Sequence, residues 1–141
     1  MPREVIHCRG HENVKAIHRS TLEITREDFL TPRGDCIICV SADKALNDLS
    51  KEFKNALRRG ARLRVVILAG EISDELIAYG SPELKLESPV SMVIRKSDYV
   101  DARTLAIRAN KAAKDLKREL VELLKNPETL VTVELIIEEK A

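Results

Sequence analysis

Residues 24–45, ITREDFLTPRGDCIICVSADKA, decide how the rest of the chain is interpreted, because residues 94–112, IRKSDYVDARTLAIRANKA, are a weaker copy of them. At an offset of 67, residues 35–68 align with residues 102–135, and 10 of those 34 positions are identical. Upstream the offset becomes 70, so the difference in length falls in a turn, where such a change is tolerated. The repeat predicts two copies of one folding unit, at about residues 14–69 and 84–138.

The repeated unit is interpreted as two strands, a helix and a third strand. Apolar and polar residues alternate over residues 14–25, as in a half-buried strand or a bent pair of strands, and residues 36–40 form a short apolar run. Apolar residues at helical spacing predict helices at residues 42–59 and 110–126, each of which stops at a glycine or a proline. Other strands are expected at residues 3–9, 62–69, 75–79, 90–95, 103–108 and 130–137.

The fold class that follows is α+β, in a single domain that spans residues 1–141. Because each unit has one apolar sheet face to bury, two helices would cover a sheet, a sandwich or an open barrel of about eight strands. The two units would pack about a pseudo-two-fold axis. A chance alignment of two amphipathic helices of similar composition is the alternative explanation of the repeat.

Composition excludes several classes of protein. Lys and Arg number 24 against 23 Asp and Glu, so the net positive field of a non-specific nucleic-acid binder is absent. No apolar run approaches the roughly 20 residues that cross a bilayer, and no signal sequence is present, so we expect a cytoplasmic protein without a membrane partner. In a reducing compartment, three cysteines do not predict a disulfide framework. The high charge and the absence of Gln and Trp favour a thermophilic source.

Two acidic and two basic positions occur in both copies. Asp28 and Arg33 of the first copy match Asp98 and Arg103 of the second, although the residues between them differ. One interpretation is an ion pair that fixes each loop. The other is that the two-fold axis brings the loops together, so that the four side chains line one cleft.

A second set of matching positions lies at the expected start of each helix. Asp43 and Asn110 are preferred N-cap residues, whose side-chain oxygen accepts a hydrogen bond from a free backbone N–H. The adjacent Lys44 and Lys111 would then project beside helix N-termini, which suit phosphate or carboxylate. Capping alone also accounts for the pattern.

The remaining chemistry-bearing residues are weaker candidates. His18 is expected on the apolar face of a strand, where a histidine is usually a hydrogen-bonded core residue, although it could also serve as a general base or a metal ligand. Cys36 and Cys39 would lie about 10 Å apart on opposite faces of a strand, so no metal site and no cofactor is assigned. The arginine cluster at residues 58–64 is interpreted as a solvated face, because the chain has almost no aromatic residues for base stacking.

Four motifs of the sequence resemble those of the archaeal family called domain of unknown function 371: TLEIT (21–25), LTPRGDCII (30–38), VSADK (40–44) and RTLAIRA (103–109). The resemblance covers nearly the whole chain and implies an archaeal source. It brings no established activity, substrate or catalytic residue. Cys39 stands where the family pattern has glycine, and Asn110 where it has aspartate, which argues against a required thiol or carboxylate at these positions.

We therefore expect a binding module for an anionic ligand, such as a nucleotide, a phosphorylated metabolite or an RNA segment, at the pseudo-two-fold cleft. The residues assigned to it are Asp28, Arg33, Asp43, Lys44, Asp98, Arg103, Asn110, Lys111 and His18. One alternative is a metal-dependent hydrolase, such as a nuclease, that uses Asp28, Asp98 or His18 as metal ligand or base. Another is a structural or oligomerisation module, in which a homo-oligomer interface covers the cleft.

Overall fold

Two four-stranded sheets make up most of the computed structural model, which describes residues 2–138. Sheet A is antiparallel throughout, and its strands in spatial order are β1 (Arg3–Arg9), β8 (Leu130–Glu138), β4 (Arg62–Ala69) and β5 (Ile72–Tyr79). The strands of sheet B, in spatial order, are β3 (Ile37–Cys39), β2 (Thr21–Thr25), β6 (Ser91–Arg95) and β7 (Thr104–Ala106). Its central pair, β2 and β6, is antiparallel, and each outer strand runs parallel to its neighbour.

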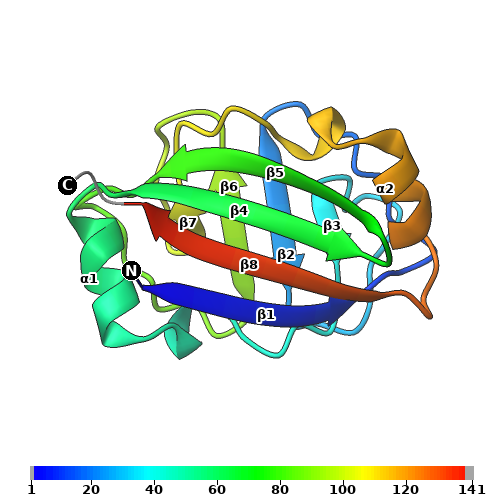
Figure 1. Cartoon of the computed structure of the whole chain (residues 1–141), viewed down its shortest axis with the longest axis horizontal. Coiled ribbons are helices and arrows are strands. Elements are labelled where there is room, and N and C mark those ends of the chain that lie inside the picture. The colour runs from blue at the N-terminus through cyan, green and yellow to red at the C-terminus, as the bar shows by residue number, and fades with distance from the viewer. Residues whose placement is uncertain (1, 139–141) are drawn as a thin grey trace.

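The two sheets face each other with their strands crossed. Figure 1 shows the strands of sheet A running lengthwise in front of sheet B, whose strands run across the view. Alternate residues of β4 and β8, among them Leu63, Val65, Val133 and Leu135, point inward and are completely buried. The predicted α+β class, rich in sheet and with about eight strands, is confirmed.

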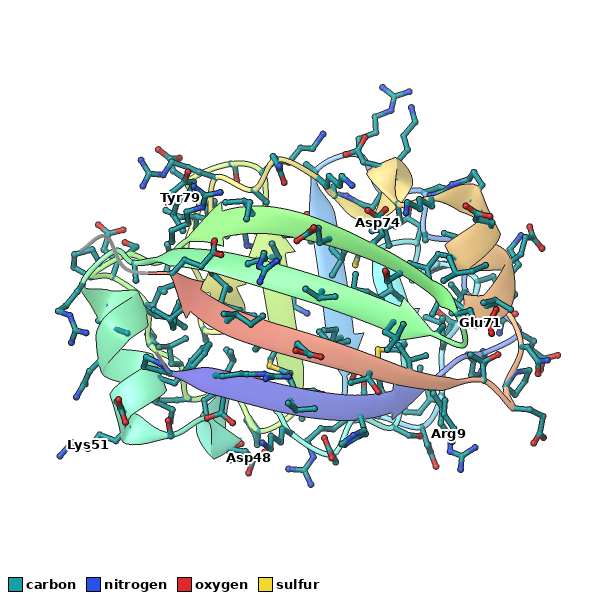
Figure 2. All side chains as sticks on the ribbon, in the orientation of Figure 1. Arg9, Asp48, Lys51, Glu71, Asp74 and Tyr79 are labelled. Atoms are coloured by element: carbon teal, nitrogen blue, oxygen red, sulfur yellow. A yellow bond between two sulfur atoms is a disulfide. The ribbon has the colours of Figure 1, made fainter. Side chains whose placement is uncertain are left out.

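The two α-helices lie at the ends of the sandwich rather than over a sheet face. Helix α1 (Lys51–Arg58) and helix α2 (Arg118–Leu124) occupy opposite ends in Figure 1. Phe53 of α1 and Leu120 of α2 are fully buried, so each helix closes one end of the core. Figure 2 shows that no helix crosses the outer face of sheet A. None of the helices in residues 2–138 has the length and apolar character needed to cross a membrane.

Both helices begin later than the sequence pattern predicted. The predicted starts at residues 42 and 110 were wrong, because a single turn of 3-10 helix and then an extended residue precede each α-helix. Leu49 and Leu116 are these extended residues, with ψ angles of 145° and 148°. The apolar residues that suggested a longer helix are buried in this irregular segment. The helical spacing of these apolar residues therefore indicates which residues are buried, and not that the segment is an α-helix.

Residues 11–20 form a loop, although alternation predicted a strand from residue 14. Val14 and Ala16 are buried as the alternation implies, but Ala16 has a φ of 49°, which an extended strand does not allow. Instead of a strand ladder, the N–H groups of Ile17 and His18 both donate to the backbone oxygen of Asp35. Within residues 14–25, the strand prediction was correct only for the part that forms β2, which begins at Thr21.

The two sheets touch at two corners. Single antiparallel bridges join Arg9 to Val40 and Tyr79 to Ile107, with N–H···O distances of 2.8 Å. No continuous ladder joins the sheets within residues 2–138, so the sandwich is not a closed barrel.

A disulfide bond between Cys8 and Cys39 stands beside the first corner. The two residues belong to β1 and β3, their Cα atoms are 5.8 Å apart, and both are buried. The expectation of unpaired cysteines was wrong, because the crossed sheets bring together two residues that are 31 positions apart. Ala78 and Ala106, both buried, occupy the matching positions of the second half.

The order of elements is the same in the two halves of the chain. β1, β2, β3, α1 and β4 are followed by β5, β6, β7, α2 and β8. The strands and helices of this second series lie 67 to 70 positions after those of the first, which is the offset of the sequence repeat. Descent of both halves from one duplicated unit stays a prediction.

Candidate functional site

The candidate site lies on the outer face of sheet B, where β2 and β6 pair. Glu23 of β2 stands opposite Val93 of β6, and residue 93 is also its counterpart at the repeat offset of 70. The two-fold axis that the repeat predicts would therefore pass between Glu23 and Val93. Leu22 and Ile24 belong to the core, so Glu23 between them points outward.

Glu23 is a nearly buried carboxylate, with its side chain 10% exposed. Its Oε1 atom accepts a hydrogen bond from Sγ of Cys36 at 3.6 Å, and it also lies 3.6 Å from Nη1 of Arg103. Burial, and then the charge of Glu23, raise the pKa of the Cys36 thiol to about 12, so this thiol is a donor at neutral pH. Sequence reasoning missed Glu23, although a charged residue between two apolar ones in a strand was an available signal.

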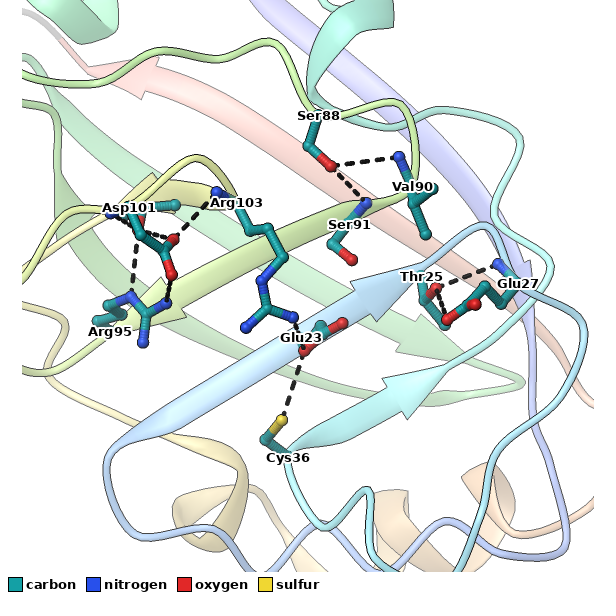
Figure 3. A network of polar contacts seen from close by, with 11 residues as sticks. Glu23, Thr25, Glu27, Cys36, Ser88, Val90, Ser91, Arg95, Asp101 and Arg103 are labelled. Atoms are coloured by element: carbon teal, nitrogen blue, oxygen red, sulfur yellow. Dashed lines mark hydrogen bonds and ion pairs between the residues drawn. The ribbon is translucent and has the colours of Figure 1, made fainter.

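Arg103 reaches the carboxylate of Glu23 by extending across β6, as Figure 3 shows. Its backbone oxygen accepts from the N–H of Val93 at 2.9 Å, as the oxygen of Cys36 accepts from the N–H of Glu23. Arg103 therefore occupies the position beside β6 that Cys36 occupies beside β2. The match of Arg103 with Arg33 that the repeat predicted does not hold in space, because Cys36, and not Arg33, has the equivalent position beside β2.

Asp101 fixes the backbone just before β7. Its Oδ1 atom accepts hydrogen bonds from the N–H of Arg103 and from Oγ1 of Thr104, both at 3.0 Å, and its Oδ2 atom accepts from Nη2 of Arg95 at 2.9 Å (Figure 3). Partial burial alone would raise the pKa of Asp101, but these donors together hold the pKa below its ordinary value. Arg103 thus projects from a loop whose backbone is held by the ionised carboxylate of Asp101.

Two exposed aromatic side chains lie in the loops that follow β2 and β6. Tyr99 is 59% exposed, and the guanidinium of Arg95 packs over its ring at 5.0 Å from the centroid. Arg95 shares a sheet face with Glu23, because it lies two positions after Val93 in β6. Phe29 is 56% exposed and occupies the matching position of the first loop.

Lys44 and Lys111 form ion pairs with nearly buried carboxylates of sheet A, while the lysine side chains themselves are 33% and 31% exposed. Nζ of Lys44 lies 2.9 Å from Oε1 of Glu4, and Nζ of Lys111 lies 2.6 Å from Oδ1 of Asp74. The carboxylate partners are only 9% and 4% exposed. These ion pairs give both lysines a structural part, and the ligand-binding role expected from the sequence stays a prediction.

Asp43 and Asn110 are not helix N-caps, because the helices begin further along the chain. Each pairs instead with an edge strand of sheet A. Oδ1 of Asp43 accepts from the N–H of His7 at 2.9 Å, and Oδ1 of Asn110 accepts from the N–H of Ile77 at the same distance. Desolvation would raise the pKa of Asp43, but the backbone and ring of His7 hold this pKa below its ordinary value. The N-cap of α1 is Ser50, whose Oγ accepts from the N–H of Phe53.

Asp28, Arg33 and Asp98 are exposed, and they do not form the predicted ion pairs. Within residues 2–138, no salt bridge joins Asp28 to Arg33 or Asp98 to Arg103. Asp98 lines a pocket of about 450 Å³ together with Glu83 and Arg108. Two carboxylates against one guanidinium make this pocket acidic, so it does not suit an anion.

His18 lies in the loop before β2 and not on a strand. Its Nδ1 atom accepts from the N–H of Ser20 at 3.2 Å, which fixes the turn into β2. Within the described part of the chain, no three His, Cys, Asp or Glu side chains are grouped so that they could hold a metal ion. The residues of the hydrolase hypothesis, Asp28, Asp98 and His18, therefore belong to no such group.

These features define an α+β protein of two crossed sheets with a buried carboxylate and a guanidinium on one outer face. The family described as "Domain of unknown function (DUF371)" matches residues 6–138, and the chain belongs to this family. It is 50% identical over 127 residues to "Uncharacterized protein MJ0206" of Methanocaldococcus jannaschii, a match that covers 90% of this chain and 94% of that protein. The family expected from the sequence motifs is confirmed.

Proposed function

We propose that this protein binds an anionic ligand, such as a nucleotide, a phosphorylated metabolite or an RNA segment, on the outer face of sheet B. The observation that carries the proposal is the state of Arg103. Its side chain is 52% exposed, and its contact with Glu23 is long, at 3.6 Å. A planar guanidinium in this position has N–H groups directed at solvent, which suit a phosphate or carboxylate group.

The surrounding residues make Arg103 the cation of this site. The neighbouring Arg95 is already bound to Asp101 and Thr104, and its side chain is only 14% exposed. The carboxylate of Glu23 holds Arg103 through one long contact of 3.6 Å and not through a close hydrogen bond. An incoming anion would therefore compete with one long contact.

This site is smaller than the cleft expected from the sequence. Of the basic residues first assigned, Arg103 carries the proposal, and Lys44 and Lys111 are bound to Glu4 and Asp74. A metal-dependent hydrolase finds less support, because its candidate ligands are not grouped within residues 2–138. An oligomerisation module stays an alternative hypothesis, which sedimentation of the free and ligand-bound protein would address.

The test is a calorimetric titration with inorganic phosphate and pyrophosphate at low ionic strength. Arg103→Ala should weaken binding by about tenfold or more, as expected for loss of a charge-assisted hydrogen bond. Glu23→Gln should strengthen binding, because it removes the competing negative charge. Arg9→Ala is the matched control, since Arg9 is an exposed arginine on β1 of the other sheet. Equal affinity in the parent protein and Arg103→Ala would refute the proposal.

A further inference from the structure

The loop that carries Arg103 also presents an aromatic ring to solvent. The chain has only four aromatic residues, two Phe and two Tyr, and two of these four, Phe29 and Tyr99, are more than half exposed. Burial of one such ring would remove a large apolar area from water. Its exposure at a ligand site therefore calls for a partner with a flat apolar surface.

The ring of Tyr99 packs against Arg95, a residue on the same sheet face as Glu23. The guanidinium of Arg95 packs under its ring at 5.0 Å, and that guanidinium is fixed by Oδ2 of Asp101 at 2.9 Å. The same carboxylate fixes the backbone N–H of Arg103. A single residue, Asp101, thus positions both the ring of Tyr99, through Arg95, and the residue that carries the exposed guanidinium.

We infer that the anion bound at this face carries a nucleobase, which stacks on Tyr99 while its phosphate contacts Arg103. The inference rests on the proposed function and names its ligand class, a 5′-nucleotide unit. One face of the Tyr99 ring is used by Arg95, and the exposure of the residue leaves ring surface for a base. Stacking of this kind tolerates any base, because every base has a π-face.

The nucleotide unit has two sources, a free nucleotide or a residue of single-stranded RNA. Phe29 distinguishes them, because it offers a second exposed ring in the matching loop after β2. A free mononucleotide needs only Tyr99, whereas a strand that crosses the β2–β6 face could also stack on Phe29. Both sources share the same base and phosphate chemistry.

The experiment compares the affinities of AMP, ribose 5-phosphate and a short single-stranded oligoadenylate by calorimetry. AMP should bind about fivefold to a hundredfold more tightly than ribose 5-phosphate, the range that base stacking on one aromatic residue provides. Tyr99→Ala should abolish this preference but keep phosphate binding, and Tyr99→Phe should keep both. Ring-proton resonances of Tyr99 should shift upfield with AMP and not with ribose 5-phosphate. Phe29→Ala should weaken oligoadenylate alone if RNA is the source.

The possible failures are distinguishable. Equal binding of AMP and ribose 5-phosphate, or an AMP preference that survives Tyr99→Ala, would overturn the inference and leave the proposed anion site intact. Failure of phosphate, AMP and oligoadenylate alike to bind would overturn both. Thermal unfolding of Tyr99→Ala, whose replaced side chain is exposed, checks that the variant is folded.

Discussion

Nζ of Lys111 lies 2.6 Å from Oδ1 of Asp74, and this pair ties the segment before α2 to the edge strand β5 of sheet A. The second oxygen of Asp74 accepts from the N–H of Lys117, the N-cap residue of α2, and Figure 2 shows Asp74 beside this segment. Lys44 and Glu4 make the corresponding pair beside α1. The matching carboxylates Glu4 and Asp74 therefore each join a lysine to the N-cap residue of the helix that follows.

Asp74→Ala should lower the free energy of unfolding by about 3 kcal/mol, because it leaves a lysine and a backbone N–H without their buried acceptor. Urea unfolding measures the loss. Lys111→Met should cost less, and the double variant should lose less than the sum of the two single variants. Glu122→Ala, which removes an exposed pair with Lys125, is the control and should change stability by less than about 0.5 kcal/mol. A change below about 1 kcal/mol in Asp74→Ala would contradict this structural part.

The stability of the protein should fall in acid. Burial alone would raise the pKa of Asp74, but Lys111 and the N–H groups of Lys117 and Glu75 hold it below its ordinary value. A depressed pKa in the folded state stabilises the protein fully above the unfolded-state pKa of about 3.9 and loses this effect as the pH falls below it. Unfolding free energies between pH 2 and 6 should therefore decrease towards low pH, and Asp74→Asn should flatten the slope. An unchanged slope in Asp74→Asn would assign the acid sensitivity to other carboxylates.

Reduction of the Cys8–Cys39 bond should destabilise the protein by about 3 to 4 kcal/mol, the chain-entropy value for a closed loop of this size. The bond spans 31 positions and lies in the core. Urea unfolding with and without reductant measures this difference in unfolding free energy. Cys36→Ala should still show the difference, and Cys8→Ala should not. Under non-reducing, denaturing conditions one thiol should titrate, and all three should titrate after reduction. Three free thiols before reduction would show that the bond does not form.

The remaining thiol, Cys36, should resist alkylation while the protein is folded. Burial and the neighbouring Glu23 raise its pKa to about 12, so only a trace of reactive thiolate exists at pH 8. Iodoacetamide should modify it slowly in buffer and rapidly in urea. Glu23→Gln should speed the reaction of the folded protein, because it removes a negative charge that raises the pKa of Cys36. Equal rates in the folded protein and in urea would mean that the thiol is neither buried nor perturbed.

Gly80→Ala should destabilise the protein by about 3 kcal/mol, since an added methyl group would overlap the backbone oxygen of Leu57 at the end of α1. Thermal and urea unfolding measure the loss. Gly60→Ala is the matched control, because its φ of 82° is strained for alanine but nothing lies within 4 Å of the added methyl. This control should cost only about 1 kcal/mol. Equal losses in the two variants would argue that steric overlap is not the cause.

Three of the four strands of sheet A were predictable because their local pattern agrees with their burial, whereas β5 begins at Ile72, before the predicted start at residue 75. β4 and β8 alternate between inward and outward residues over their whole length, and their predicted bounds differ from the observed ones by one residue at most. The segment before α1 was not predictable in this way. Leu46 and Leu49 are buried at helical spacing, yet the chain there is irregular because Glu4 of β1 holds the N–H of Ser50. A partner 46 positions away decides this conformation.

The candidate site stays a prediction, and only some of its residues could be named from the sequence. Arg103 lies on the outer face of sheet B, beside the pairing of β2 with β6. Its partners Glu23 and Cys36 were missed, because only the pairing of β2 with β6 and β3 reveals them as neighbours. The low aromatic content argued against base stacking, but the number of rings says nothing about which of them reach solvent. Tyr99 is exposed because it lies in a loop and its side chain does not pack into the core.

The opposition of Glu23 and Val93 also sets how a ligand can sit on this face. Two identical halves would present two equivalent half-sites, and a ligand could bind in either of two orientations related by the axis. Here the carboxylate of Glu23 stands opposite the isopropyl group of Val93. The thiol of Cys36 stands where the other half has the guanidinium of Arg103. The two halves thus differ in their side chains where β2 and β6 meet. For the anionic ligand proposed above, this difference predicts a stoichiometry of one ligand per chain, bound in a single orientation.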